Sequence, residues 1–248
     1  MNTTKKFPYW GVDGCKSGWF CVGINKTGDH RHFVEGHIKN VVSKVMELGG
    51  KTILIDIPIG LPSDAEERDC DKQARKRIGN KRGPAVFRVP CLQAIEVFDE
   101  AGVEVAKQKN CEITGLKLSN QTWAIAPKIS EVNRYLKENK KCHGVLREVH
   151  PEVCFRMLSE AELEHNKKKR EGFQERQRIL NQTLSKNPFD EIRNKYLKKA
   201  VADDDINDAL VAAVTALLGA HTGLKTLPKS PPKDENGLPM EMVYFEGK

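Results

Sequence analysis

Two acidic residues stand at the ends of hydrophobic segments that are typical of buried β-strands. Asp13 lies in the run Trp-Gly-Val-Asp-Gly that ends at Gly14, and Asp56 directly follows the apolar run Ile53-Leu-Ile. Burying a carboxylate costs much free energy unless an opposite charge compensates it, and a divalent cation does so well. The pattern therefore predicts a metal-dependent active site at the ends of two buried strands.

A second pair of acids precedes the longest apolar stretch of the chain. Asp205 and Asp208 directly precede the apolar stretch from Ala209 to Ala220. This region is the best-defined helix in the sequence. Residues three apart share one face of a helix, so both carboxylates can approach the same site. The stretch is too short to span a bilayer, and the chain shows no secretory start, so we expect a cytoplasmic protein.

The order of predicted elements begins β-β-β-α-β. Strands are predicted over 9–13, 19–24 and 32–38, where β-branched and aromatic residues gather, followed by a helix over 41–48 that Gly49-Gly50 closes. The segment 51–57 has no polar alternation until Asp56, which is typical of a strand buried on both faces.

The rest of the chain is rich in predicted helices. Helical patterns cover 64–78, 92–107, 129–140, 152–163, 167–178 and 204–219, a strand is predicted over 144–150, and a last edge strand over 242–245. We expect a single domain over 1–248 with a helical insertion at about 60–142.

Composition places few limits on the partner. The 248 residues are 39% hydrophobic and 30% charged, with a formal net charge of +7. This balance suits nucleic acid or another phosphate-bearing partner, but a solvated lysine-rich surface explains it equally well. The seven cysteines include no Cys-x-x-Cys pair, which favours free thiols over a zinc site.

An ordered set of motifs resembles one protein family. The motifs are Gly-Val-Asp-Gly at 11–14 with Gly-Trp at 18–19, Ile-Asp-Ile-Pro-Ile-Gly-Leu at 55–61, Arg-Asp-Cys-Asp at 68–71, Glu-Val-His-Pro-Glu at 148–152, and Asp-Asp-Ile-Asn-Asp-Ala-Leu at 204–210. The chain resembles the DUF429 proteins, which are predicted nucleases of the ribonuclease H-like superfamily. This resemblance implies an α/β fold with a mixed five-stranded sheet, in which three antiparallel strands precede parallel ones and helices flank the sheet.

The last helix also resembles that of Holliday-junction resolvases of the RuvC type, in which two aspartates three residues apart precede Ala-Leu. Those resolvases usually carry glutamate on the fourth strand, where this chain has Asp56. Phosphodiester hydrolysis needs a nucleophilic water and charge neutralisation on the phosphate, which two Mg²⁺ or Mn²⁺ ions can supply. We expect Asp13 to bridge the two ions, Asp56 and Asp208 to bind one each, and Asp205 to act as an auxiliary ligand.

Each of these acids also has a structural interpretation. Asp13 could be a turn residue beside Gly14, and the three aspartates at 203–205 could supply a helix cap and favourable dipole charges. Capping cannot explain Asp208, which lies inside the helix among apolar neighbours.

Two further candidates lie at the end of the predicted strand over 144–150 and just after it: His150 and Glu152. Glu152, or alternatively Glu148, could be a further catalytic acid, and His150 could contact substrate or shuttle a proton. The alternatives are a buried structural histidine and a glutamate that merely starts a helix after Pro151.

Four basic residues are further candidates for substrate binding: Lys16, Arg75, Lys81 and Arg82. Lys16 could equally be a solvated loop residue. Arg75 shares helical spacing with Arg68 and Asp71, which together could clamp phosphate or form a surface ladder of ion pairs.

The sequence thus predicts a Mg²⁺- or Mn²⁺-dependent nuclease that acts on DNA or RNA. A non-catalytic nucleic-acid-binding protein of the same fold is the alternative. A phosphotransferase is a weaker third, because glycine-rich phosphate loops are missing.

Overall fold

The chain folds into two compact units. The computed structural model describes residues 5–159 and 161–247. Unit 1 comprises Met1–Asp56, Gly144–Lys225 and Val243–Lys248, and unit 2 comprises Ile57–His143 and Thr226–Met242. The insertion predicted at about 60–142 falls within unit 2, which also takes in a segment close to the C-terminus.

Unit 1 is built on a five-stranded mixed sheet. Its strands are β1 (Tyr9–Cys15), β2 (Gly18–Ile24), β3 (His30–Glu35), β4 (Thr52–Ile55) and β5 (Leu146–Glu148). The order across the sheet is β3-β2-β1-β4-β5. β1, β2 and β3 pair antiparallel, whereas β4 runs parallel to both β1 and β5. This topology confirms the predicted ribonuclease H-like sheet.

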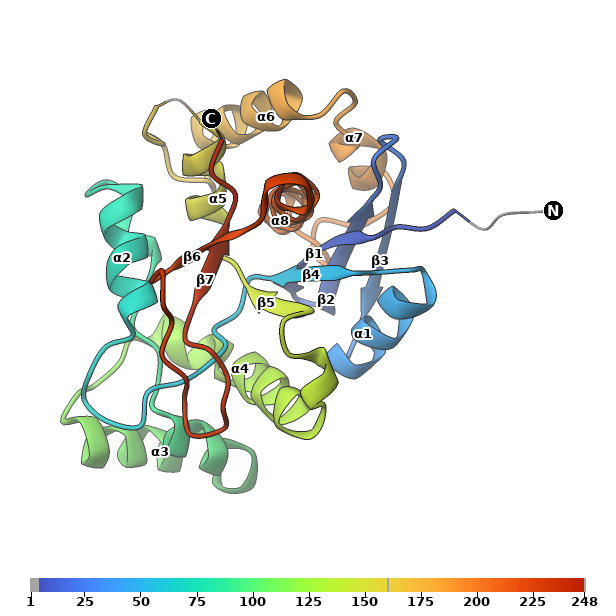
Figure 1. Ribbon diagram of the computed structural model, residues 1–248. Helices are drawn as coiled ribbons and strands as arrows, with labels where there is room; N and C mark the ends of the chain where they lie inside the picture. The colour runs from blue at the N-terminus through green and yellow to red at the C-terminus, as the bar shows by residue number, and fades with distance from the viewer. Residues whose placement is uncertain (1–4, 160, 248) are drawn as a thin grey trace. The chain divides into compact units, whose positions relative to one another are not determined.

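Helices cover both faces of this sheet (Figure 1). α1 (Ile38–Glu47) packs on one face, where its buried residues recur at helical spacing. α8 (Asp203–Thr222) lies on the other face and contacts β1, β2 and β4. Three shorter helices surround α8: α5 (Pro151–Leu158), α6 (Arg170–Thr183) and α7 (Phe189–Arg193). α8 is therefore the central helix of unit 1, which explains why it is apolar almost all round.

Several elements differ in their bounds from the predicted ranges, and at two of them the structure shows a local reason. The third strand ends at Glu35, and Ile38 begins α1 because His37 is extended and the carbonyl of His37 accepts from the N–H of Val41. The charged helix predicted over 167–178 begins only at Arg170. Asn166 explains the delay, because its side chain accepts from the N–H of Lys168 at 2.9 Å and holds a turn there.

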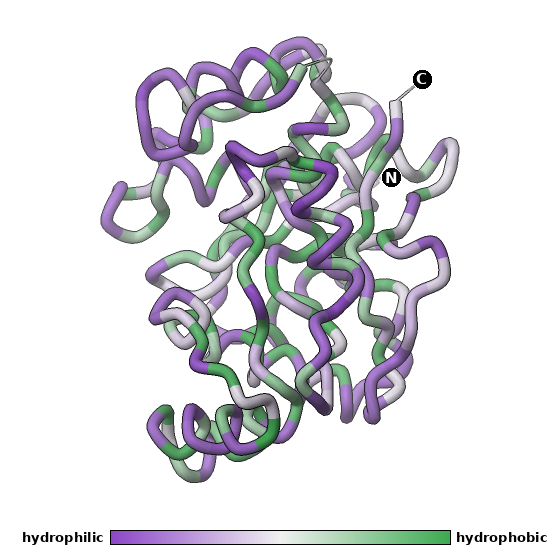
Figure 2. Tube along the Cα trace, turned by 90° about the vertical axis from the view of Figure 1, so that its left-hand side faces the viewer, coloured by the Kyte–Doolittle hydropathy of each residue, from purple (hydrophilic) through white to green (hydrophobic). Residues whose placement is uncertain are grey.

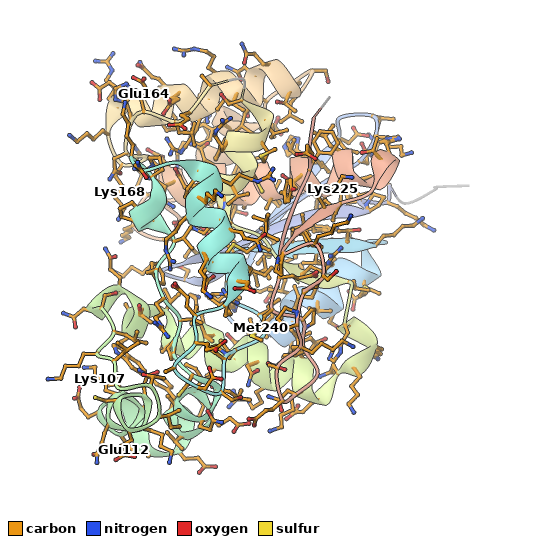
Figure 3. The ribbon with its side chains drawn as sticks, turned by 60° about the vertical axis from the view of Figure 1, so that its left-hand side comes forward. Lys107, Glu112, Glu164, Lys168, Lys225 and Met240 are labelled. Carbon is orange, nitrogen blue, oxygen red and sulfur yellow. The ribbon has the colours of Figure 1, made fainter. Side chains whose placement is uncertain are left out.

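Unit 2 contains three α-helices and two 3₁₀ turns. The helices are α2 (Asp69–Ile78), α3 (Leu92–Thr114) and α4 (Asn120–Glu138), and the turns are η1 (Gly83–Ala85) and η2 (Lys140–Cys142). α2 is mostly hydrophilic (Figure 2). α3 bends at Gly102 and carries Lys107 and Glu112, which are labelled in Figure 3. Both α3 and α4 extend beyond their predicted ranges.

The C-terminal segment adds two short strands. β6 (Lys225–Leu227) and β7 (Met242–Tyr244) pair with each other, and Val243 also forms an isolated parallel bridge with Val149 beyond β5. The strand predicted over 242–245 is thus present. Across the described residues, no helix combines the length and apolar character that crossing a membrane requires.

The contact between α8 and β1 is unusually close at Gly11. A Cβ atom built on Gly11 would lie 2.0 Å from the carbonyl oxygen of Ala209 and 2.4 Å from the backbone nitrogen of Ala213. Both neighbours are backbone atoms of α8, which no side-chain rotation can move away. Gly11 therefore sets the distance between the central helix and the sheet.

We predict that Gly11→Ala destabilises the protein by about 1–3 kcal/mol or more, because the methyl group forces α8 away from the sheet. Urea unfolding followed by circular dichroism measures this change. Gly36→Ala is the matched control, because a Cβ at Gly36 meets no atom within 4 Å. Equal stability of the two variants would contradict the close packing described here.

Candidate functional site

Asp13 and Asp56 lie side by side at the same end of two parallel strands. Val12 is the register partner of Ile55, and the N–H of Asp56 donates to the carbonyl of Val12 at 2.9 Å. The two aspartates each follow this pair, so they share one face of the sheet. That face is the one that α8 covers, because Gly11, two residues before Asp13, contacts α8.

α8 brings Asp205 and Asp208 to the same place. Asp208 immediately precedes Ala209, whose carbonyl lies against Gly11, and its side chain is 1% exposed. Asp205 lies one turn earlier and is half-buried. These four aspartates, Asp13, Asp56, Asp205 and Asp208, are called the acid cluster below.

The charges of the acid cluster act on one another. Burial raises the pKa of Asp13 well above its ordinary value, and the charges of Asp56, Asp208 and Asp205 raise it further. Burial also raises the pKa of Asp56 and that of Asp208 to about 6 each, against an opposing effect of Lys167. The structure thus brings together all four aspartates that were predicted as metal ligands.

Lys167 supplies positive charge to this cluster. Its Nζ is ion-paired with Oδ2 of Asp208, and its side chain is 29% exposed. Burial alone would lower the pKa of Lys167, but Asp208, Asp13 and Asp56 together raise it above its ordinary value. Lys167 therefore stays protonated and partly compensates three buried carboxyl groups.

The carboxylate oxygens of α8 differ in their partners. Oδ2 of Asp205 accepts from the backbone N–H of Ala202 at 2.7 Å, so Asp205 caps the helix as well as adding charge to the cluster. Oδ1 of Asp208 is buried and has no hydrogen-bond partner. A buried oxygen of this kind is costly unless a ligand satisfies it.

Glu152 lies in the first turn of α5, and its charge raises the pKa of both Asp56 and Asp208. Its Oε1 accepts from Nε of Arg176 at 3.2 Å and forms a second, shorter bond with the same guanidinium. Both side chains are almost completely buried. The glutamate therefore adjoins the acid cluster while it also ties α5 to α6.

His150 and Glu148 flank the same stretch of chain. The carbonyl of His150 accepts from the N–H groups of Val153 and Cys154 at the start of α5. Glu148 is buried on β5 as the register partner of Ile55. Glu148 shares the sheet face of Ile55, whereas Asp56, the next residue, lies on the other face. Glu152, whose charge raises the pKa of both Asp56 and Asp208, is therefore the better placed of the two candidate glutamates.

The predicted basic contacts are divided between the two units. Lys16 is exposed in the turn between β1 and β2 of unit 1. Arg75 belongs to unit 2, where it donates to the carbonyl of Val86 at 2.7 Å and pairs with Glu67. Lys81 and Arg82 lie in the unit 2 loop that follows α2.

Of the two alternatives for Arg68, Asp71 and Arg75, a phosphate clamp or a surface ladder of ion pairs, the surface ladder is wrong. Arg68 and Asp71 form a buried pair at 2.7 Å, in which both side chains are at most 1% exposed. The guanidinium of Arg68 also donates to the carbonyls of Ile59 and Gly60. Arg68 is therefore buried because it satisfies backbone carbonyls at the start of unit 2.

Two residues of the site were not predicted, Lys167 and Arg176. Both fall in a segment whose many charges are typical of a solvated helix, so charge alone gave no reason to place them inside. A local signal exists in Asn166 and Gly172. Asn166 closes the turn in which Lys167 lies, and a Cβ at Gly172 would lie 2.0 Å from the carbonyl of Asn166.

The donor chemistry of the acid cluster fits a hard divalent cation. All its donors are carboxylate oxygens, which Mg²⁺ and Mn²⁺ prefer, and Oδ1 of Asp208 lacks a partner. With Lys167 paired to Asp208, the described residues contain no group of three or more His, Cys, Asp or Glu arranged to hold a metal ion. Metal binding would therefore require these side chains to turn toward one another and Lys167 to leave Asp208.

The fold and the site define an α/β protein with a ribonuclease H-like sheet and a buried acidic centre. The profile of the family described as "Protein of unknown function (DUF429)" matches residues 11–233, so the chain belongs to this family. The match includes all the residues of the acid cluster. No curated protein and no solved structure shows significant similarity to the chain.

We predict that the acid cluster makes the protein less stable as pH rises from about 4 to 7. The pKa of Asp56 and that of Asp208 are about 6 in the folded state, against an ordinary value of 3.8. Between these values the folded state binds more protons than the unfolded state, so stability falls as pH rises through 6. One pKa unit corresponds to about 1.4 kcal/mol, so the effect is of the order of 1 kcal/mol or more.

Urea unfolding at pH 5 and pH 7 measures this difference. Asp56→Asn should reduce the loss of stability between the two pH values, because an amide does not titrate. Asp190→Asn, at an exposed position in the first turn of α7, should leave it unchanged. The idea fails if Asp56→Asn retains the pH dependence of the wild type.

Proposed function

We propose that the protein is a metal-dependent nuclease that hydrolyses phosphodiester bonds in nucleic acid, with Mg²⁺ or Mn²⁺ as cofactor. The observation that carries the proposal is the position of Asp13, Asp56 and Asp208 on one face of unit 1, with their charges coupled. Three buried carboxyl groups that repel one another destabilise a protein, and groups with such raised pKa values are typical of functional sites. Binding of cations gives these groups a function.

The catalytic residues of the proposal are the acid cluster and Glu152. The charges of Asp56 on β4 and of Asp205 and Asp208 on α8 all act on Asp13, so Asp13 would suit a ligand shared by two ions. Asp56 and Asp208 would each hold one ion. Asp205 would assist with Oδ1, since its Oδ2 accepts from the N–H of Ala202. Bound cations supply an activated water and neutralise charge on the phosphate. In the hydrolysis, the oxygen of water would bond to phosphorus, one P–O ester bond would break, and a proton from the water would end on the leaving oxygen, which gives a phosphate monoester and a free hydroxyl group.

Lys167 and Arg176 have distinct roles in this proposal. Arg176 fixes Glu152 through two donors, so the glutamate keeps its orientation beside Asp56 and Asp208. Lys167 is protonated and only 29% exposed beside Asp208. Once released from Asp208, its ammonium group can bind the phosphate or neutralise the departing oxygen.

A non-catalytic nucleic-acid-binding protein is the second candidate. The pairs Lys167–Asp208 and Glu152–Arg176 favour it, because each gives a buried acid a structural partner. In that case the ion pairs would be permanent, and removing one partner would cost about 3–5 kcal/mol of stability. Cleavage and metal linkage distinguish the two functions.

We predict that the wild type cleaves at least one substrate in a panel of labelled single-stranded, duplex and branched DNA and RNA with Mg²⁺ or Mn²⁺, and none with chelator. Asp13→Asn and Asp208→Asn should each lower the cleavage rate at least about 100-fold, because loss of a ligand removes charge stabilisation of the transition state. Gel analysis of the products measures the rate. Asp190→Asn is the control and should cleave as the wild type does.

Two results would count against catalysis. Cleavage that persists in both Asp13→Asn and Asp208→Asn would indicate a contaminating nuclease or a different site. Binding of nucleic acid without cleavage under any metal condition would favour the second candidate.

We also predict that Mn²⁺ or Mg²⁺ stabilises the wild type against heat. At 100 times its dissociation constant, a ligand specific for the folded state adds about 2.7 kcal/mol, which is a rise of roughly 5–10 °C for a chain of this length. Asp13→Asn should be more stable than the wild type without metal, because it removes repulsion, and should respond less to metal. Melting curves that are insensitive to both metals in the wild type would contradict the metal centre.

A further inference from the structure

A basic pocket lies beside the acid cluster within unit 1. Its volume is about 400 Å³. The residues that define it come from the turn before α6, from α6 itself and from the approach to α8: Lys167, Lys168, Lys169, Arg170, Phe173 and Lys198. We call it the basic pocket.

Three of its cations have no acidic partner. Among the described residues, no carboxylate forms an ion pair with Lys168, Lys169 or Arg170, and all three side chains are exposed. Lys168 lies on the connection between α5 and α6 (Figure 3). Three like charges on consecutive residues repel one another, so an anion bound among them is favoured.

The acidic part of the lining does not cancel this charge. It carries Asp203 and Asp204 at the start of α8. Asp203 is already paired with Arg193 at 3.0 Å and with Lys198 at 2.7 Å, and these contacts lower its pKa. The cations before α6 therefore outnumber the acids that remain unpaired in the pocket.

Lys167 connects the pocket to the acid cluster. It lines the pocket, and its Nζ is paired with Asp208. A phosphate held by the neighbouring cations would thus lie close to the carboxylates, because Lys167 reaches from the lining of the pocket to Asp208. The buried, unpartnered Oδ1 of Asp208 calls for a donor or a cation at the acid cluster, whereas the neighbouring lysines and Arg170 offer donors to an anion.

Phe173 gives the pocket an aromatic wall. Its ring is half-buried and packs edge-to-face on Phe189, with the ring centroids 5.1 Å apart. This contact fixes the ring while part of it still lines the pocket. Cations that follow a backbone, together with an aromatic ring on which a base stacks, are the usual means of binding single-stranded nucleic acid.

We propose that the basic pocket binds one nucleotide of a single-stranded nucleic acid next to the acid cluster, with Lys168, Lys169 and Arg170 on its phosphate and Phe173 on its base. The volume of about 400 Å³ lies in the range of small-molecule sites and is suited to one nucleotide. A duplex keeps its bases stacked, so the pocket selects single strands. The proposal deepens the proposed function, because it names the substrate of the same site.

Fluorescein-labelled twelve-nucleotide dT and rU strands test the pocket in chelator, where no cleavage occurs. The double variant K168A/R170A should weaken binding about tenfold or more and lower the slope of log K against log salt by about 0.7, which corresponds to the loss of one phosphate contact on a single strand. Phe173→Leu should weaken binding about fivefold or more without changing that slope, because stacking is not ionic. Fluorescence anisotropy at several salt concentrations measures both quantities.

The control variant K26A/K39A removes the same charge from exposed positions of unit 1 outside the pocket. If it weakens binding as much as K168A/R170A, only net charge matters and the pocket is overturned. Equal affinity for a hairpin duplex would overturn the preference for single strands. Melting curves confirm that each variant is folded.

The result is independent of the nuclease test. Loss of binding in K168A/R170A and F173L supports the pocket even if the wild type shows no cleavage, in which case the nuclease proposal alone fails. Cleavage by the wild type with unchanged binding in these variants would overturn the pocket and leave the nuclease proposal standing.

Discussion

The close approach of α8 to β1 is the constraint on which the site depends. Only a residue without a Cβ allows the backbone of α8 to lie against β1, and Gly11 provides it. Alanines at 209, 212 and 213 keep the helix side of the contact equally thin. The acids stand directly beside this contact, Asp13 two residues after Gly11 and Asp208 one residue before Ala209. A wider separation of helix and sheet would move Asp208 away from Asp13 and Asp56 and would abolish the coupling of their charges.

This packing creates an electrostatic cost that the fold compensates only in part. Burial is the largest cause of the raised pKa of Asp13, Asp56 and Asp208. Repulsion by other aspartates adds to it at Asp13 and Asp208, and repulsion by Glu152 adds to it at Asp56. Lys167 and Arg176 each neutralise one acid, Asp208 and Glu152 respectively. Compensation by two cations leaves a net negative charge in the interior of unit 1, together with one unsatisfied oxygen of Asp208. A structural network is usually satisfied completely, so this remaining charge favours a site that binds cations over one that only stabilises the fold.

The sequence predicted the sheet and the acid cluster because both depend on local patterns. Runs of β-branched residues indicate buried strands, and an acid at the end of such a run is conspicuous; Asp13 and Asp56 were found in this way. Asp208 was found because capping could not explain it, whereas Asp205 proved to cap α8 while adding charge to the cluster. Lys167 and Arg176 were not found, since the direction of a charged side chain depends on which face of its segment meets the core. Lys167 lies in a turn that Asn166 closes through a side-chain hydrogen bond to the N–H of Lys168, and hydrophobic periodicity does not reveal such a bond.

Lys167 links the stability of the protein to its proposed activity. In the structure its ammonium group reduces the repulsion among Asp208, Asp13 and Asp56. A divalent cation would compensate the same acids better, because it carries twice the charge and can bind several oxygens at once. Lys167 would then be free to turn toward the basic pocket, which it already lines. Cation binding at the acids and phosphate binding in the pocket would therefore favour each other, since each removes a reason for Lys167 to remain paired with Asp208. Such a coupling is reciprocal, so nucleic acid in the pocket would also raise the affinity of the acid cluster for metal.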